Sequence, residues 1–143
     1  MIAVRPAAKS DRGAILKIIE ESGLYYPKQR LSGFWLAEEN ERVIGIIRLE
    51  KHRDFYFLSS LGVAKDRRDQ GIATTLLKKV LNEAKEPVYL YTIIPDFFSR
   101  LGFKVVPRPS FLPVREIFNC GECQPEKCVC MIYSPNLRRS EGE

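Results

Sequence analysis

The sequence predicts a single α/β domain built on a mixed β-sheet that is flanked by helices. Apolar runs of strand length alternate with stretches whose apolar residues recur at the helical period of about 3.6. Two early runs have the pattern of an antiparallel hairpin, whereas the later runs are separated by helices. The chain has 143 residues, 45% of them hydrophobic, and lacks repeats and long linkers, so one core is expected.

The first half of the chain begins with a predicted strand, which a predicted helix follows. Ser10 supplies an N-cap, Asp11 a first-turn acid, and Gly23 suits the C′ position of this helix. Its apolar residues follow helical spacing: Ala14, Ile15, Ile18 and Ile19. The other elements predicted here are a strand at 2–4, a loop or short helix at 24–32, hairpin strands at 34–38 and 42–49, and a long strand at 55–63.

The second half of the chain is dominated by a helix that starts after Gly71. One stripe of this helix is apolar, and it consists of Ile72, Ala73, Leu76, Leu77, Val80, Leu81 and Ala84. The later predictions are a strand at 88–92, a short helix from Pro95 to Gly102, and strands at 104–106 and 129–133. We therefore expect one domain over 1–135, with an irregular Pro- and Cys-containing insertion at 107–127 and a frayed tail at 136–143.

The charge and the ends of the chain limit the partners that we expect. The formal net charge of +5 favours anionic ligands, but the basic residues are spread along the chain rather than gathered in one stripe. No recognised nucleic-acid motif accompanies them, so nucleic acid is not expected as a partner. The N-terminus lacks the apolar region of a signal peptide, and no apolar run approaches the ~20 residues of a membrane span. A cytoplasmic protein without a membrane partner is the expectation.

The turn before the long helix has the composition of an anion site. Backbone N–H groups at a helix start have no intrahelical partners and lie at the positive end of the helix dipole. The small side chains of Gly71 and Ala73 let an anion approach the backbone, and Arg67 and Arg68 add positive charge. The same residues also suit a simple turn with a solvated flank, so on its own the turn leaves both interpretations open.

Further motifs in this sequence resemble those of the GNAT (GCN5-related N-acetyltransferase) superfamily. Arg68, Gly71 and Ala73 match its acetyl-CoA signature, Gln/Arg-x-x-Gly-x-Gly/Ala. The stretch 97–103, Phe-Phe-Ser-Arg-Leu-Gly-Phe, matches a second element, an aromatic pair followed by Leu-Gly-Phe. The hairpin from Phe34 also looks like the second and third strands of that superfamily. The resemblance implies an N-acetyltransferase that moves acetyl from acetyl-CoA to the amine of a small molecule.

The resemblance further implies where the cofactor binds. The sheet should be splayed, with its fourth and fifth strands parting to admit the pantetheine arm. Backbone groups of Leu61 and Val63 would then bond pantetheine. The pyrophosphate would be held by the backbone amides of Arg68, Gln70, Gly71, Ile72, Ala73 and Thr74. The acceptor amine would attack the thioester directly in a ternary complex, while an amide of the fourth strand polarises the carbonyl.

The catalytic groups of the superfamily are not reproduced in this sequence. Phe98 stands where many members carry a proton-donating Tyr, and the strand segment 56–60 lacks the Glu that many members carry there. Tyr91 and Asp96 are the catalytic candidates, and Thr92, Ser99 and ordered water are further possibilities. Packing on a strand is the alternative for Tyr91, as a first-turn helix acid is for Asp96. His52, in a charged loop, is expected to be a solvated residue.

The C-terminal third narrows the resemblance to short bacterial N-acetylglutamate synthases. In those proteins a Leu-Pro-x-Lys run precedes a Cys-x-x-Cys…Cys segment, which here corresponds to 112–115 and 120–128. This sequence departs from the pattern in having Arg115 in place of the Lys and one residue fewer before Cys128. The resemblance implies an amino acid such as glutamate as acceptor, in amino-acid biosynthesis, with Arg48, Arg115 and Thr92 as substrate-binding candidates. Both a monomer and a homodimer are compatible with the sequence.

The four cysteines allow three interpretations. Cys120, Cys123, Cys128 and Cys130 could bind a structural zinc ion, remain reduced packing thiols, or include a redox pair. A second functional class also stays open, namely an acyl-CoA-binding regulatory module without catalytic groups. Within the enzyme class, the amine of a polyamine or of a protein is the alternative acceptor.

Overall fold

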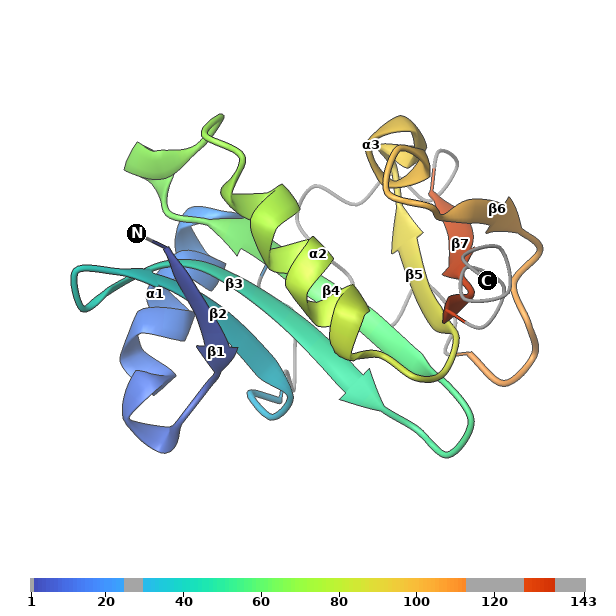
Figure 1. Cartoon of the computed structure of the whole chain (residues 1–143), viewed down its shortest axis with the longest axis horizontal. Helices are drawn as coiled ribbons and strands as arrows, with labels where there is room; N and C mark the ends of the chain where they lie inside the picture. The colour runs from blue at the N-terminus through green and yellow to red at the C-terminus, as the bar shows by residue number, and fades with distance from the viewer. Residues whose placement is uncertain (1, 25–29, 113–127, 136–143) are drawn as a thin grey trace.

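The computed structural model describes residues 2–24, 30–112 and 128–135, and it confirms the predicted α/β class. Seven strands form one sheet in the order β1-β2-β3-β4-β5-β7-β6 within this part of the chain (Figure 1). The strands are β1 (Ala3–Pro6), β2 (Phe34–Glu39), β3 (Arg42–Lys51), β4 (Tyr56–Val63), β5 (Val88–Thr92), β6 (Lys104–Val106) and β7 (Val129–Tyr133). The helices are α1 (Arg12–Glu21), α2 (Ile72–Glu83) and α3 (Pro95–Ser99), with short 3-10 helices at Lys9–Asp11 and Lys65–Arg67.

The predicted strands and the two longer helices occur, within one or two residues at their ends, whereas α3 stops three residues before Gly102. The loop or short helix predicted at 24–32 lies mostly outside the described residues. Ser10 is an exception in detail, because it lies inside the 3-10 helix that leads into α1 and does not cap it. Asp11 bonds back to the amide of Ala8, so the helical turn starts earlier than expected. Most of the proposed insertion at 107–127 and the tail at 136–143 lie outside the described residues.

The sheet is mixed, and its one parallel contact is short. β1, β2, β3 and β4 pair antiparallel in sequence, as do β5 with β7 and β7 with β6. β4 and β5 pair in parallel at only two positions, Tyr56 with Val88 and Phe57 with Tyr89. Beyond those pairs the two strands have no ladder between them, so the sheet is splayed there.

A β-bulge in β4 lies just past the point where the strands part. Arg48 of β3 pairs with Ser59 and Ile46 with Gly62, so two residues of β4 oppose the one residue between them. One of the two, Ser60, has a φ of 55°. A bulge bends its strand and increases the local twist. The bend carries the end of β4 away from β5.

The two faces of the sheet are covered by different helices (Figure 1). α2 packs on one face, here called the α2 face, where it buries the largest core together with α3. That core includes Leu58, Leu76, Leu77, Val80, Val88, Leu90, Phe98, Phe103 and Met131. α1 packs on the other face, the α1 face, against Phe34, Leu36 and Ile46. A third cluster, which includes Phe57, Tyr91 and Cys130, lies apart from the α1 cluster.

One partly buried ion cluster connects the first strand to the first helix. The guanidinium of Arg5 donates to both oxygens of Asp11, at 2.8 and 3.0 Å, and to Glu38 at 3.0 Å. The amide of Ala8 donates to the same Asp11 carboxylate at 2.7 Å. The Arg5 hydrogen bonds, followed by that of Ala8, lower the pKa of Asp11 to about 2.

We expect Asp11→Asn to lower the free energy of unfolding by about 1–2 kcal/mol at pH 7. The folded pKa of about 2 lies below the ordinary value of 3.8, so this stabilisation is complete above about pH 5 and is lost as the pH falls towards 2. The measurement is urea unfolding at a series of pH values. Glu83→Gln is the control, because Glu83 pairs with Lys79 at an exposed site, where the effect should stay below about 0.5 kcal/mol. A wild-type-minus-D11N difference that does not depend on pH would contradict this account.

The close approach of α2 to the sheet depends on Gly45. A Cβ at this position would lie 2.9 Å from Ile72 Cγ2 and 2.9 Å from Leu76 Cδ1, and both side chains are fully buried. Real Cβ atoms essentially never show such contacts, so a side chain here forces Ile72 and Leu76 in the first turns of α2 to shift.

We therefore expect Gly45→Val to destabilise the protein by about 1–3 kcal/mol through overpacking. Gly13→Ala is the matched control, because a Cβ at Gly13 meets nothing within 4 Å and alanine favours the helix. That control should be neutral or stabilise by up to about 1 kcal/mol. Thermal or denaturant unfolding of the two variants measures the contrast, and equal effects would show that packing at Gly45 is not tight.

Candidate functional site

The turn between β4 and α2 presents uncapped helix amides. The N-cap of α2 is Gly71, whose φ of 78° is left-handed, and no side chain bonds to the first amides of the helix. Asp69 is also left-handed, with a φ of 64°. A Cβ on Gly71 would meet nothing within 4 Å, so the space beside the turn is open. Backbone of this kind, ahead of a helix dipole, forms a concavity suited to an anion.

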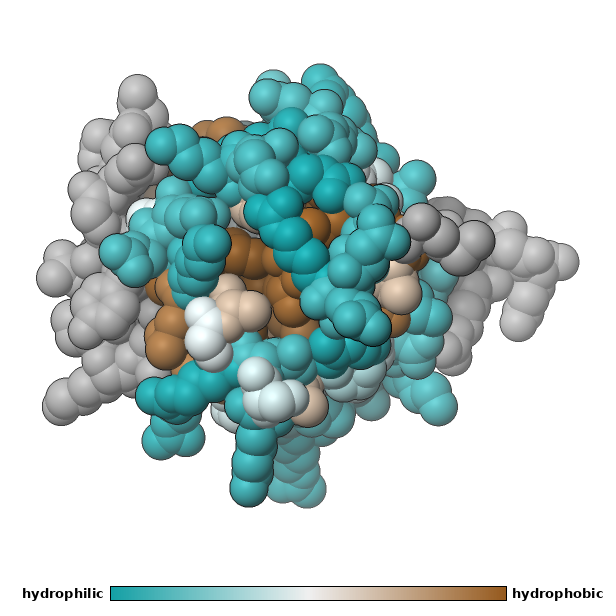
Figure 2. Space-filling view, turned by 90° about the vertical axis from the view of Figure 1, so that its left-hand side faces the viewer, coloured by the Kyte–Doolittle hydropathy of each residue, from teal (hydrophilic) through white to brown (hydrophobic). Residues whose placement is uncertain are grey.

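Two ion pairs fix this turn to the end of the β2–β3 hairpin. Arg67 donates to Glu39 at 2.8 Å and to the side-chain oxygen of Gln70 at 2.8 Å. Arg42 donates to both oxygens of Asp66, at 2.8 and 2.6 Å. The hydrogen bonds from Arg42 lower the pKa of Asp66 to about 2. Seen from this end of the molecule, hydrophilic side chains surround a strip of apolar ones (Figure 2).

Arg68 connects the same turn to the C-terminus of α1. Its guanidinium donates to the carbonyl of Glu21 at 3.0 Å and to the hydroxyl of Ser22 at 3.4 Å. It also donates to the carbonyl of Val63 at 3.4 Å. A cation at the C-terminal end of a helix is favoured by the helix dipole. Arg67 and Arg68 thus hold the turn in place through long-range contacts, in addition to the charge that their sequence position suggested.

Past the two parallel pairs, one edge of β4 has no strand partner among the described residues. Leu61 and Val63 lie in this stretch, and both pack partly buried against the core on the α2 face. On the opposite side of the opening, Ile93 and Ile94 follow β5 and are 42% and 56% exposed. An unpaired strand edge offers N–H and C=O groups to an extended ligand, and apolar side chains favour its methylene groups.

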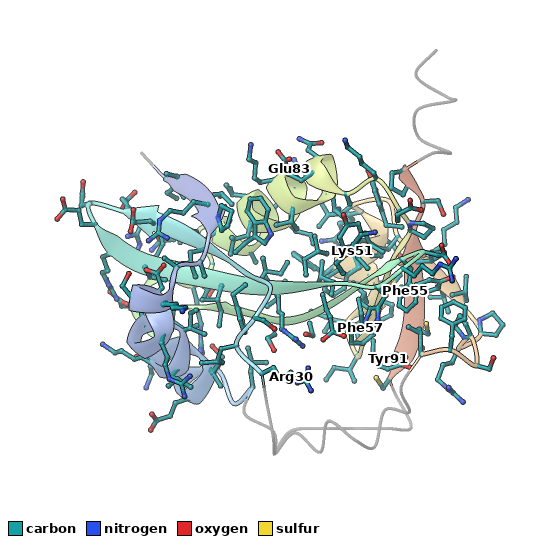
Figure 3. The ribbon with its side chains drawn as sticks, turned by 90° about the horizontal axis from the view of Figure 1, so that it is seen from below. Arg30, Lys51, Phe55, Phe57, Glu83 and Tyr91 are labelled. Atoms are coloured by element: carbon teal, nitrogen blue, oxygen red, sulfur yellow. The ribbon has the colours of Figure 1, made fainter. Side chains whose placement is uncertain are left out.

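The α1 face of the same region carries aromatic and polar side chains. The rings of Phe57 and Tyr91 meet edge to face, with centroids 5.4 Å apart across the parting strands. Figure 3 shows both on the side of the sheet opposite α2, together with Arg30. Ser59 lies on this face opposite Arg48, and its buried hydroxyl has no hydrogen-bond partner in the described structure.

A chain of charged side chains runs along β3 on this face. Arg48, whose side chain is only 7% exposed, donates to the carbonyl of Ser32 at 2.7 Å and pairs with Glu50 at 2.7 Å. The other oxygen of Glu50 lies 2.6 Å from His52 Nε2. The His52 ring stacks on Phe55 with centroids 4.5 Å apart. His52 is 39% exposed, so it reaches solvent as expected, but the sequence did not predict these partners.

The remaining predicted site residues lie in three different places. Thr92 is buried, and its hydroxyl accepts the amide of Ile94 at 2.9 Å, which stabilises the corner after β5. Asp96 is exposed in the first turn of α3, whose Phe98 packs in the core on the α2 face, apart from the cluster that contains Tyr91. Arg115 lies outside the described residues.

The cysteine segment is described only in part. Cys128 and Cys130 lie among the described residues as reduced thiols, whereas Cys120 and Cys123 fall in the undescribed range 113–127. Cys130 is buried, and burial raises the pKa of its thiol, which disfavours the thiolate that metal binding needs. No group of three or more metal-ligating side chains occurs among the residues placed by the structure. None of the described helices is long and apolar enough to cross a membrane.

Sequence reasoning missed Glu50, Ser59, Ile93 and Ile94. The alternation Arg48-x-Glu50-x-His52 was a usable signal, because residues two apart on a strand share a face. The strand prediction ended at 49, so the alternation was not followed to its end. Ser59 had no such signal, because its position depends on the pairing between β3 and β4.

Comparison with known proteins relates this architecture to acetyltransferases. A family model described as "Acetyltransferase (GNAT) family" matches residues 8–103. N-acetyltransferase 8B of Rattus norvegicus is 31% identical over an alignment of 83 positions, which covers 54% of this chain and 37% of that protein. An uncharacterized N-acetyltransferase of Chlorobaculum tepidum is 26% identical over an alignment of 145 positions, which covers 89% of this chain and 90% of the relative.

Solved structures share the fold at low sequence identity. N-acetylglutamate synthase from Neisseria gonorrhoeae, complexed with coenzyme A and N-acetyl-glutamate, has a TM-score of 0.72 at 17% identity. The match covers 94% of this chain but 35% of the synthase, so the chain spans about a third of that protein. Rv2747 from Mycobacterium tuberculosis, in complex with CoA and NLQ, has a TM-score of 0.70 at 20% identity and covers 92% and 98% of the two chains.

Proposed function

Because the chain belongs to the acetyltransferase (GNAT) family, we propose that it transfers acetyl from acetyl-CoA to the amine of a small molecule. The observation that carries the proposal is the parting of β4 from β5 directly beside the uncapped N-terminus of α2. One ligand can thereby place an extended arm on a strand edge and an anion on a helix. Acetyl-CoA has both parts.

The proposed cofactor contacts are those that the resemblance implied. Backbone groups of Leu61 and Val63 would bond the pantetheine arm at the unpaired edge of β4. The pyrophosphate would bind the amides of Arg68, Gln70, Gly71, Ile72, Ala73 and Thr74. Support comes from the open space beside Gly71 and from the ion pairs that fix the turn. Ile93 and Ile94 would line the arm on the β5 side.

We propose direct transfer in a ternary complex. The neutral amine attacks the thioester carbon, an amide of β4 near the bulge polarises the carbonyl oxygen, and the CoA thiolate leaves. Tyr91 is proposed as a proton-transfer group because its ring lies beside the parting strands. Asp96, which is exposed in the first turn of α3, is also proposed as a proton-transfer group that acts through water. Phe98 cannot serve, because it lacks a hydroxyl and is buried.

An amino acid such as glutamate is the proposed acceptor, in amino-acid biosynthesis. The supporting observation is the fold shared with the N-acetylglutamate synthase, whose complex contains N-acetyl-glutamate. Arg48, Arg115 and Thr92 are the proposed contacts of the acceptor. Arg48 already pairs with Glu50, so an acceptor carboxylate would have to share its guanidinium with that side chain.

A non-catalytic acyl-CoA-binding module is the alternative, and two observations favour it. Phe98 is sealed in the core at the position where the resemblance places a tyrosine, and β4 carries no acid. Such a module would bind acetyl-CoA and release no CoA in the presence of amines. Polyamine and peptide amines remain alternative acceptors for the enzyme.

A screen of amines separates these functions. The measurement is release of the CoA thiol from acetyl-CoA in the presence of amino acids, polyamines and short peptides, together with calorimetric binding of acetyl-CoA. We expect amine-dependent release with an amino acid, and mass spectrometry should find the N-acetylated product. Binding of acetyl-CoA without release for any amine would overturn the enzyme in favour of the regulatory module.

Gly71 offers a test of the proposed pyrophosphate contact. We expect Gly71→Asp to weaken acetyl-CoA binding by about tenfold or more relative to Gly71→Asn, because only the carboxylate repels the pyrophosphate. Asp and Asn have the same shape and both tolerate a left-handed φ, so the pair isolates charge. Gly13→Asp, in the first turn of α1, is the control for net charge. Equal acetyl-CoA affinities of the Gly71→Asp and Gly71→Asn variants would show that the pyrophosphate does not bind at this turn.

A further inference from the structure

We propose that Glu50 accepts the proton of the acceptor amine, and that Arg48 and His52 position it for this role. The inference rests on the proposed transferase function, and it names a catalytic residue that the sequence did not indicate. The carboxylate of Glu50 is joined on one side to a buried guanidinium and on the other to an imidazole at the surface.

The register of the sheet places these side chains beside the opening. Arg48, Glu50 and His52 alternate along β3 and its end, so they lie on one face. Arg48 pairs with Ser59 and Glu50 with Phe57, and these two residues of β4 flank the point where β4 leaves β5. Glu50 therefore lies one strand away from the start of the proposed thioester channel.

The acceptor can reach that channel only from the α1 face, as far as the described residues show. On the α2 face, the parting strands are covered by a continuous core that includes Leu58, Leu77, Leu90 and Phe98. On the α1 face, Ser59 and Tyr91 beside the opening are partly exposed, and the hydroxyl of Ser59 is buried without a hydrogen-bond partner among the described residues. A buried polar group without a partner is unfavourable unless a ligand or water satisfies it. The acceptor amine, or its carbonyl neighbour, is suited to do so.

Glu50 is the carboxylate that the described strands provide on this face. The other two strand carboxylates, Glu38 and Glu39, are bound by Arg5 and Arg67 at the opposite end of the sheet. The side chain of Glu50 is 33% exposed, so an amine can reach it. The side chain of Arg48 is only 7% exposed, so it stays buried beside Glu50. Arg48 is itself fixed by the carbonyl of Ser32. The pair thus holds one carboxylate in a fixed position.

The proposed step conserves protons. The acceptor arrives as an ammonium ion, since amines titrate at about 8 to 10.4. It gives one proton to Glu50, its nitrogen then forms the C–N bond with the thioester carbon, and the C–S bond breaks. The second proton of the nitrogen passes to the leaving thiolate, which gives the amide and the CoA thiol. Glu50 returns its proton to water through His52, which is 39% exposed.

The groups facing Glu50 determine how a pH experiment is interpreted. Arg48 lies on the same strand as Glu50 and His52 just past its end, Ser59, Tyr89, Tyr91 and Cys130 come from strands on the same face, and Arg30 precedes β2 there. Burial raises the pKa of Tyr89 and of Cys130, so neither ionises in the neutral range. Lys51 lies over the Tyr56 ring on the other face and does not take part.

The decisive experiment compares Glu50→Gln with wild type between pH 6.5 and 10. It uses acetyl-CoA and the amine that gives the fastest thiol release in the screen above. Removing a general base should lower kcat by about 10²–10⁴-fold at pH 7 with acetyl-CoA affinity unchanged. The deficit should shrink as the pH rises, because the amine then loses its proton to water. Glu83→Gln, on α2 and far from this face (Figure 3), should match wild type at every pH.

His52 is tested as a positioning residue. His52→Gln should reduce kcat less than Glu50→Gln and change the pH profile, while the KM for acetyl-CoA stays constant. If Glu50→Gln fails to fold, Arg48→Met combined with Glu50→Gln takes its place, because it leaves no unpaired charge at buried Arg48. If a folded Glu50 variant shows no loss of kcat, or the same loss at every pH, the role of Glu50 is overturned and the proposed transferase function stands. A wild-type protein that acetylates no amine overturns the proposed function together with this inference.

Discussion

The site described here depends on where β4 stops pairing with β5. The two parallel strands share two ladder pairs, and the bulge at Ser60 then bends β4 away. A strand that loses its neighbour must satisfy its backbone groups elsewhere, or leave them available to a ligand. The opening is therefore a consequence of hydrogen-bond register, with apolar walls that Leu61 and Ile94 supply. A continuous parallel ladder would have closed the same sheet into an ordinary buried core.

The turn ahead of α2 is held by segments that are distant in the sequence. Glu39 and Arg42 from the hairpin bind one side of it, and Arg68 reaches the carbonyl of Glu21 at the end of α1 on the other. Gly45 allows α2 to lie directly on β3, which fixes where its first amides point. The amides are thus preorganised by ordinary surface ion pairs and by close packing. Preorganisation of this kind reduces the ordering that a bound anion has to impose.

Local signals in the sequence predicted most of the fold and part of the site. Gly71 was expected to adopt a turn conformation and does so, because only its own backbone decides it. The helix at 72–83 followed from apolar period, and the splay followed from the resemblance. The bulge could not be predicted, since Ser60 is not a residue type that marks a left-handed φ. The partners of Arg48 and Arg68 could not be predicted either, because Ser32 and Glu21 approach them only after the sheet is assembled.

The short contact between β4 and β5 also has a mechanical consequence. The part of the sheet formed by β5, β7 and β6 is joined to the rest through the ladder at Tyr56 and Phe57, and through the core beneath α2. The joint lies at one end of the strands and the opening at the other, so the geometry is that of a lever. A small rotation at the joint becomes a larger displacement between Val63 and Thr92. Side chains at the joint, such as Val88, can therefore set the width of the opening without lining it.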